Sequence, residues 1–151
     1  MTKMLDLIHM MQRGEIAPPP VAALIGFTLA SVEPGCAVVE FEATPRHANP
    51  MGTLHGGVLC DIADAAMGMA CASLLDEGES FTTLELKINF LRPVLDASLE
   101  ARARVVHSGK SMVYLECEVV ALPEEKLVAK ASSTCTILRG EQAKGRGGTA
   151  P

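Results

Sequence analysis

A histidine and two glycines at the start of an apolar segment are the residues of this chain best suited to chemistry. His55-Gly56-Gly57 precedes a nearly uniform apolar run that carries a carboxylate at Asp64, and Asn49 lies just upstream. Glycines that open a helix can present bare backbone N–H groups to a carbonyl oxygen. A carboxylate on a buried helix is costly unless it is paired or used. Together these residues indicate an acyl-transfer site.

The composition predicts one folded domain. With 151 residues, 48% of them hydrophobic and only 3% aromatic, the chain can build a core from small aliphatic side chains. The net charge of −5 argues against nucleic-acid binding. Five scattered cysteines without C-x-x-C spacing predict neither a disulfide framework nor a zinc site, so we expect a soluble, cytoplasmic protein. The apolar stretch 65–75 is too short to span a bilayer, and we expect no membrane association.

Periodicity and turn residues divide the chain into three parts. Residues 1–19 are expected to form an N-terminal helix and a proline-rich connector, because apolar residues from Met4 to Met11 share one helical face. Residues 20–139 are expected to form the main domain, opening with a helical turn over 21–25. Residues 140–151 are rich in glycine and charge and predict a disordered tail.

The main domain predicts an α+β fold, with one long helix wrapped by a curved antiparallel sheet of about six strands. Alternating apolar residues and turn residues place the strands at 26–32, 36–43, 83–91, 97–107, 112–122 and 127–138, and the helix at 56–75. In the run 83–91, Leu84 and Leu86 fall on the buried face, and Thr83 falls on the other face. Because the helix is apolar nearly all round, one sheet cannot cover it, and a partner subunit is expected to help.

The spacing of Gly56 and Asp64 limits how they can act together. They are eight residues apart, which is about 12 Å along a helix axis. A carboxylate at that distance cannot attack a carbonyl held at the helix N-terminus. The two residues therefore serve different purposes, or Gly56 of one chain meets Asp64 of another across a two-fold axis, which would create two equivalent sites.

The order of these residues resembles a known family. Three motifs resemble those of hotdog-fold acyl-CoA thioesterases of the PaaI (phenylacetyl-CoA thioesterase-like) type. They are Asn49-Pro50-Met51-Gly52-Thr53-Leu54-His55-Gly56-Gly57 with Asp64, Asn89-Phe90-Leu91-Arg92-Pro93, and Ser108-Gly109-Lys110-Ser111. The resemblance covers roughly residues 20–139. It implies hydrolysis of aryl or medium- to long-chain acyl-CoA to free acid and CoA, without a metal or redox cofactor. It also implies a homodimer with joined sheets and shared active sites, often paired into a homotetramer.

The resemblance also implies roles for individual residues. The N–H of Gly56 would polarise the thioester carbonyl, and Asp64 would act as nucleophile or as general base for water. Asn49 and His55 would orient substrate, water or the loop. A hydroxyl on the first strand after the helix would assist, with Thr83 as the best match and Thr82 as the alternative.

Substrate binding needs positive charge for the CoA phosphates and an apolar pocket for the acyl group. Arg92 and Lys110 are preferred as phosphate ligands because they lie at turns, whereas Arg102, Arg104 and Lys130 lie within strands. Met67 and Met69 are expected to line the acyl pocket or the core, and Met67 and Gly57 are grouped with the substrate-binding residues.

Other interpretations fit the sequence less well. Gly109-Lys110-Ser111 resembles the end of a P-loop but lacks its first glycine and its strand-to-helix context. A metal site at His55, Asp61 and Asp64 lacks ligand spacing. Asp61 is the rival to Asp64 as catalytic acid, and the carboxylate beside Cys60 disfavours a thiolate nucleophile. A hotdog hydratase or dehydratase of enoyl or 3-hydroxyacyl thioesters, and a non-catalytic acyl-CoA-binding protein, are the alternative functions.

Overall fold

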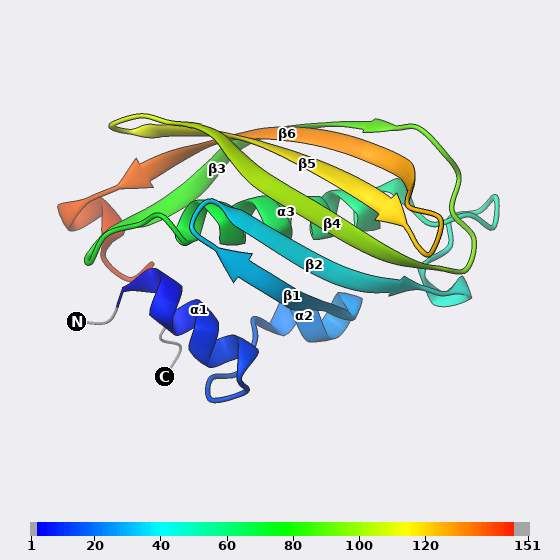
Figure 1. The fold of residues 1–151 in the computed structure, drawn as a ribbon, viewed down its shortest axis with the longest axis horizontal. Coiled ribbons are helices and arrows are strands. Elements are labelled where there is room, and N and C mark those ends of the chain that lie inside the picture. Colours follow the sequence, from blue (N-terminus) through cyan, green and yellow to red (C-terminus); the bar gives the residue numbers. More distant parts are fainter. Residues whose placement is uncertain (1–2, 147–151) are drawn as a thin grey trace.

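Six antiparallel strands form one curved sheet around a central helix (Figure 1). The computed structural model describes residues 3–146. The strand order is β1-β2-β4-β5-β6-β3, with β1 and β3 at the edges. The elements are α1 (Met4–Gln12), α2 (Pro20–Ile25), β1 (Phe27–Glu33), β2 (Cys36–Ala43), η1 (Pro45–His47), α3 (Gly56–Ala72), β3 (Ser80–Phe90), β4 (Ala97–Ser108), β5 (Met112–Ala121), β6 (Lys126–Leu138) and η2 (Gly140–Ala143). The predicted α+β architecture is confirmed.

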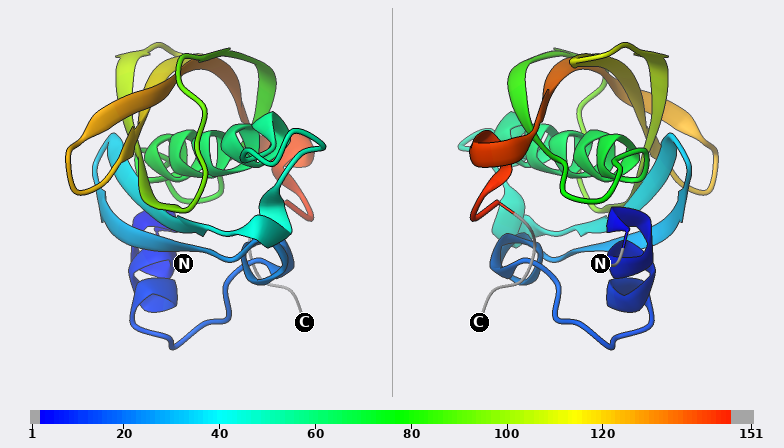
Figure 2. Two further views of the ribbon diagram at one scale, coloured as in Figure 1. Left: turned by 90° about the vertical axis from the view of Figure 1, so that its right-hand side faces the viewer. Right: turned by 90° about the vertical axis from the view of Figure 1, so that its left-hand side faces the viewer.

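Helix α3 forms the centre of the core. The sheet curves around it (Figure 2) and buries Leu59, Ile62 and Met67 on the side that faces the strands. Asp61 and Asp64 lie on another side of the helix and are exposed in the single chain. The sheet therefore leaves one side of α3 uncovered, and this side, which we call the open side, carries both carboxylates.

A β-bulge in β3 reverses the alternation of side chains in the middle of that strand. Thr83 pairs with Cys135 of β6, whereas Glu85 pairs with the next residue, Thr134, so Leu84 is an extra residue. Leu84 is 56% exposed. The prediction that Leu84 is buried and Thr83 faces away is therefore wrong, because a bulge changes which residues share a face.

The bulge allows residues of odd and even number to face α3 from one strand. Phe81, before the bulge, and Leu86 and Ile88, after it, pack against the hydrophobic core. In a regular strand, residues 81 and 86 would point to opposite faces.

The N-terminal segment packs against the main domain. Ile8 is buried in the same core as α3, and α1 contacts both β1 and α3. Pro20 begins α2, where its missing N–H costs no hydrogen bond. Gly26 ends α2 with a φ of 96°, a left-handed conformation that favours glycine. None of the helices within residues 3–146 has the length and hydropathy to span a membrane.

The C-terminal segment differs from the predicted disordered tail over its first residues. Residues 140–143 form the 3₁₀ helix η2, and the Ser80 hydroxyl donates a hydrogen bond to the Arg146 carbonyl at 3.0 Å. Arg139 pairs with Glu79 at 2.6 Å. These contacts fix the segment beside the start of β3, while residues 147–151 lie outside the described part of the chain.

Ser73 connects the C-terminal end of α3 to the β1–β2 turn. Its buried hydroxyl accepts a hydrogen bond from the Gly35 N–H at 2.8 Å and donates one to the Ala70 carbonyl at 2.7 Å. Gly35 has a φ of 78°, and a Cβ atom on it would lie 3.8 Å from Leu74 Cδ1. This contact holds the helix that carries the carboxylates against the sheet.

We expect Ser73→Ala to lower the free energy of unfolding by about 1–3 kcal/mol, because the buried Gly35 N–H would lose its acceptor. Urea denaturation followed by circular dichroism measures the change. The matched control is Ser31→Ala at an exposed position of β1. Equal stability of the two variants would show that the Ser73 contact contributes nothing.

Candidate active site

Asp64 and Thr83 form a hydrogen-bonded pair on the open side of α3. The Thr83 hydroxyl of β3 lies 3.3 Å from Asp64 Oδ1 and donates to it. Cys135 Sγ of β6 lies 3.8 Å from the same hydroxyl. The bulge after Thr83 is what turns this residue toward the helix. Thr83, rather than the alternative Thr82, is the residue that contacts Asp64.

The surroundings of Asp64 raise the pKa of its carboxyl above the ordinary range. Partial burial in the cavity makes the largest contribution, and the negative charge of Asp61, one turn away, adds to it. The hydrogen bond from Thr83 acts in the opposite direction. Solvent still reaches Asp64 in the single chain, so the carboxyl is accessible as well as partly desolvated. A carboxylate with a raised pKa is a stronger base, which suits proton transfer near neutral pH.

His55 caps the N-terminus of α3. Its Nδ1 accepts a hydrogen bond from the Gly57 N–H at 2.8 Å, so Nδ1 carries no proton. A Cβ atom on Gly57 would lie 2.9 Å from that nitrogen, which explains the second glycine. Gly57 was expected to bind substrate, but His55 already occupies its N–H. Among residues 3–146, no group accepts a hydrogen bond from the Gly56 N–H.

Asn49 closes the loop that leads to this cap. Its Oδ1 accepts hydrogen bonds from the N–H groups of Met51 and Thr53, and its Nδ2 donates to the Thr53 hydroxyl. The Leu54 N–H donates to the Val94 carbonyl at 2.7 Å. Of the roles considered for Asn49, the one seen in the single chain is fixing the loop, and with it the position of His55.

Phe90 is a site residue that the sequence did not single out for a role. A Cβ atom on Gly56 would lie 2.8 Å from Phe90 Cζ, so the ring of Phe90 lies directly over Gly56. Phe90 is 55% exposed at the end of β3. Its place in the alternating pattern of β3 predicted a core residue. An exposed ring beside a helix N-terminus is instead well placed to cover a bound thioester and exclude water.

A cavity of about 590 Å³ lies along the open side of α3. Its lining includes Asp61, Asp64, Ala65, Gly68 and Met69 of α3, Phe81 and Thr83 of β3, and residues of α1, α2, β1 and β2. The α3 residues beyond Asp64 that line it carry no charge, and the cavity is within the size range of ligand pockets.

The two methionines of α3 have different surroundings. Met67, which was grouped with the substrate-binding residues, is fully buried in the core and does not line this cavity. Met69 lines the cavity instead. Met69 follows Met67 by two positions, which rotates its side chain by about 200° around the helix axis.

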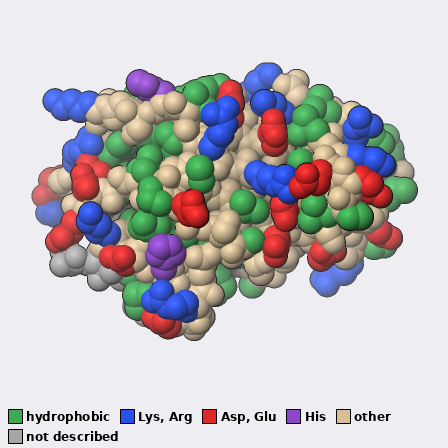
Figure 3. Space-filling view, viewed as in Figure 1, with side chains coloured by type: hydrophobic (Ala, Val, Ile, Leu, Met, Phe, Trp, Pro, Cys, Tyr) green, Lys and Arg blue, Asp and Glu red, His purple; other side chains and the backbone are tan. Residues whose placement is uncertain are grey.

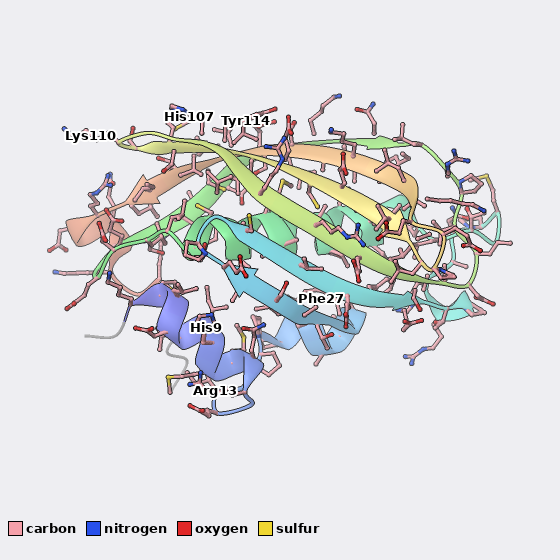
Figure 4. All side chains as sticks on the ribbon, in the orientation of Figure 1. His9, Arg13, Phe27, His107, Lys110 and Tyr114 are labelled. Atoms are coloured by element: carbon pink, nitrogen blue, oxygen red, sulfur yellow. The ribbon has the colours of Figure 1, made fainter. Side chains whose placement is uncertain are left out.

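The positively charged residues are separated in the single chain. Arg104 and Lys130 pair with Glu116 and Glu118 on the neighbouring strand β5. Arg102 pairs with Glu100 on its own strand and with Glu125 in the β5–β6 turn, and the face drawn in Figure 3 shows such interspersed charges. Lys110 lies at the β4–β5 hairpin (Figure 4), at the opposite end of the molecule from the N-terminus of α3. Arg92 is two residues after Phe90, whose ring lies over Gly56 at that N-terminus. Within one chain, the structure does not bring Arg92 and Lys110 together.

The rival chemistries have no support in the described part of the chain. Burial and the charges of Asp61 and Asp64 raise the pKa of the Cys60 thiol, which keeps it protonated. Within residues 3–146, no three His, Cys, Asp or Glu side chains are grouped as metal ligands. Lys110 is in a hairpin turn rather than at a strand-to-helix loop.

The site therefore consists of two halves in each chain. One half is the α3 N-terminus with Gly56, His55 and the loop of Asn49. The other half is the pair of Asp64 and Thr83, about 12 Å further along the helix axis. The first half can stabilise negative charge on an oxygen, because the Gly56 N–H and the helix dipole point toward it. The second half can act as a base or nucleophile.

Comparisons with known proteins identify the family of the chain. Residues 51–128 match the family model described as "Thioesterase superfamily". The chain is 34% identical to a 1,4-dihydroxy-2-naphthoyl-CoA hydrolase of Listeria monocytogenes, over 75% of this chain and 89% of that protein. It is 34% identical to the acyl-coenzyme A thioesterase PaaI of Escherichia coli, over 72% of this chain and 75% of that protein.

Solved structures give the same result. The structure of the E. coli PaaI protein from the phenylacetic acid degradation operon superposes with a TM-score of 0.77 at 29% identity, covering 85% of this chain and 91% of that one. The region of this chain that matches the family model, residues 51–128, contains both Gly56 and Asp64. The chain belongs to the thioesterase superfamily, as a thioester hydrolase with the PaaI-like hotdog fold.

Proposed function

We propose that this protein hydrolyses the thioester of acyl-CoA to a free acid and CoA. The observation that carries the proposal is the pair of Asp64 and Thr83 at an apolar cavity, on the same helix whose N-terminus has an unused Gly56 N–H. The relatives named as CoA-thioester hydrolases support the choice of CoA as the leaving group. The five unpaired cysteines support a cytoplasmic location.

The two halves of the site would be completed by a second copy of the chain. The open side of α3 is apolar apart from its carboxylates, and the edge strand β3 has unpaired backbone groups along it. An antiparallel pair of α3 helices would bring Gly56 of one subunit to Asp64 of the other, twice, around a two-fold axis. We propose a homodimer with shared active sites, which can pair further into a homotetramer.

In this dimer the reaction uses both halves at once. The thioester carbonyl accepts a hydrogen bond from the Gly56 N–H, and the dipole of α3 stabilises the charge that develops on oxygen. Asp64 of the other subunit attacks the carbonyl carbon, or removes a proton from the water that attacks it. Both routes require a deprotonated Asp64, and both end with release of the CoA thiol.

The acyl group would occupy the cavity beyond Asp64. Its uncharged lining on α3, with Ala65, Gly68 and Met69, fits aryl or medium- to long-chain acyl groups. The CoA phosphates need cations at the mouth of the site. The antiparallel dimer brings opposite ends of two subunits together. Arg92 of one subunit and Lys110 of another therefore remain our proposed ligands for the CoA phosphates.

We expect Asp64→Asn to keep the fold and the oligomeric state but to lower kcat by at least about a hundredfold, the size of a lost base or nucleophile. The measurement is release of free thiol from a panel of acyl-CoA substrates. Circular dichroism and gel filtration check the fold. Near-normal turnover would eliminate Asp64 as the catalytic carboxylate, and Asp61→Asn tests its rival in the same assay.

We expect mixtures of two inactive variants to recover activity. Asp64→Asn and Gly56→Val, refolded together in equal amounts, should give about a quarter of wild-type turnover, because half of the dimers are hybrids with one intact site each. Each variant refolded alone is the control. No recovery, with mixed dimers shown by mass spectrometry, would contradict a site shared between subunits.

The neighbours of Asp64 predict shifts in the pH profile of kcat. Activity should rise with pH as Asp64 loses its proton, with a midpoint above the ordinary range of a carboxyl pKa. Asp61→Asn removes a like charge that raises this pKa, so the midpoint should move to lower pH. Thr83→Val removes a hydrogen bond that lowers it, so the midpoint should move to higher pH.

The exposed Asp6→Asn on α1 is the control and should leave the midpoint unchanged. If Asp61→Asn and Thr83→Val moved the midpoint in the same direction, Asp64 would not be the group that titrates.

A further inference from the structure

The N-terminal segment supplies a wall of the cavity that holds Asp64. Met11 and Gln12 of α1, Pro18 and Pro19 of the connector, and Ala22 of α2 all line it. The carboxylates line the same space from α3. The cavity therefore lies between the helix that carries the proposed chemistry and a segment that has no catalytic group of its own.

This wall is held firmly against the main domain. Ile8 is only 3% exposed, in the same core as α3. The Gln12 side chain donates a hydrogen bond from Nε2 to the Ala30 carbonyl of β1 at 3.2 Å. The prolines at 18–20 restrict the backbone between the two helices. A wall fixed in this way sets the width of the cavity rather than adapting to its contents.

The wall also lies outside the matched family region. The family model covers residues 51–128, which include Asp64 and Thr83 but none of residues 11–23. The proposed reacting groups thus lie within the family model, and one side of the cavity is formed by residues that precede it. Substrate size can then change through the N-terminal segment without any change in the reacting groups.

We propose that residues 11–23 determine which acyl groups the enzyme accepts, by limiting the size of an apolar acyl chain that lies along α3. This inference rests on the proposed thioesterase function. The wall contributes the methionine, proline and alanine side chains named above, and the amide nitrogen of its one polar member, Gln12, is already engaged by Ala30. Selection is therefore by size and shape, as expected for a hydrophobic pocket.

The test uses two variants with opposite expected effects. Met11→Ala removes bulk from the wall, and Ala22→Leu adds it. Met10→Ala and Leu24→Ala are the matched controls, because these neighbours on α1 and α2 do not line the cavity. The full-length variants are assayed for thiol release with butyryl-, octanoyl-, dodecanoyl-, hexadecanoyl- and phenylacetyl-CoA. The readout is the ratio of kcat/KM between long and short acyl chains.

We expect Met11→Ala to raise the ratio of kcat/KM for hexadecanoyl-CoA to that for octanoyl-CoA by about tenfold. Ala22→Leu should lower this ratio by a similar factor. The reason is that one methylene in a hydrophobic pocket changes specificity by about tenfold or more. Both controls should keep the wild-type ratio. Circular dichroism shows whether each variant folds. Val21 lines the cavity and is 46% exposed, so Val21→Phe replaces Ala22→Leu if the buried substitution prevents folding.

The outcomes separate the two proposals. If the wild-type enzyme releases thiol but both cavity variants keep its chain-length ratio, the N-terminal wall has no role in selection, while the thioesterase function stands. If the wild-type enzyme releases no thiol from any of the five substrates, the proposed function fails and this inference fails with it.

Discussion

The fixed rise of an α-helix determines how this protein can work. Gly56 and Asp64 belong to one continuous helix, and about 12 Å of backbone along the axis separates them. No side-chain rotation shortens that distance enough for both to reach one carbonyl group. Under the proposed function, Gly56 and Asp64 act on one carbonyl group, and this requires α3 to meet the same helix of a second copy. The open side of α3 and the unpaired edge of β3 support this proposal.

The bulge in β3 solves a second geometric problem. The strand has to place an apolar face against α3 and a hydroxyl beside Asp64, but a regular strand presents only every second residue to one face. The extra residue Leu84 shifts the phase, so Thr83 and Leu86 both face the helix. Bulges are frequent beside active sites for this reason. The exposed Leu84 is the cost of this arrangement.

Much of this architecture could be predicted from local patterns. Alternating apolar residues together with turn residues located the strands, and the spacing of Gly56 and Asp64 indicated two half-sites. The bulge could not be predicted, because the sequence around Leu84 alternates without interruption. The contact of Phe90 with Gly56 was missed for a related reason. It joins the end of a strand to the start of a helix, and only the tertiary fold brings these together. Met67 and Met69 were indistinguishable by residue type, and only the orientation of α3 separates them.

Helix α3 packs into the core on its sheet side and lines the cavity on its open side. Its sheet side carries bulky Leu59, Ile62 and Met67, which are buried and supply the hydrophobic stabilisation. Its open side carries small residues, and a Cβ atom on Gly68 would lie 3.3 Å from Phe81 Cζ, tighter than an ordinary contact. A mid-helix glycine costs about 1 kcal/mol relative to alanine, and the partial desolvation of Asp64 adds to that cost. The buried sheet side of α3 offsets both costs, so one helix carries both the core and the candidate site.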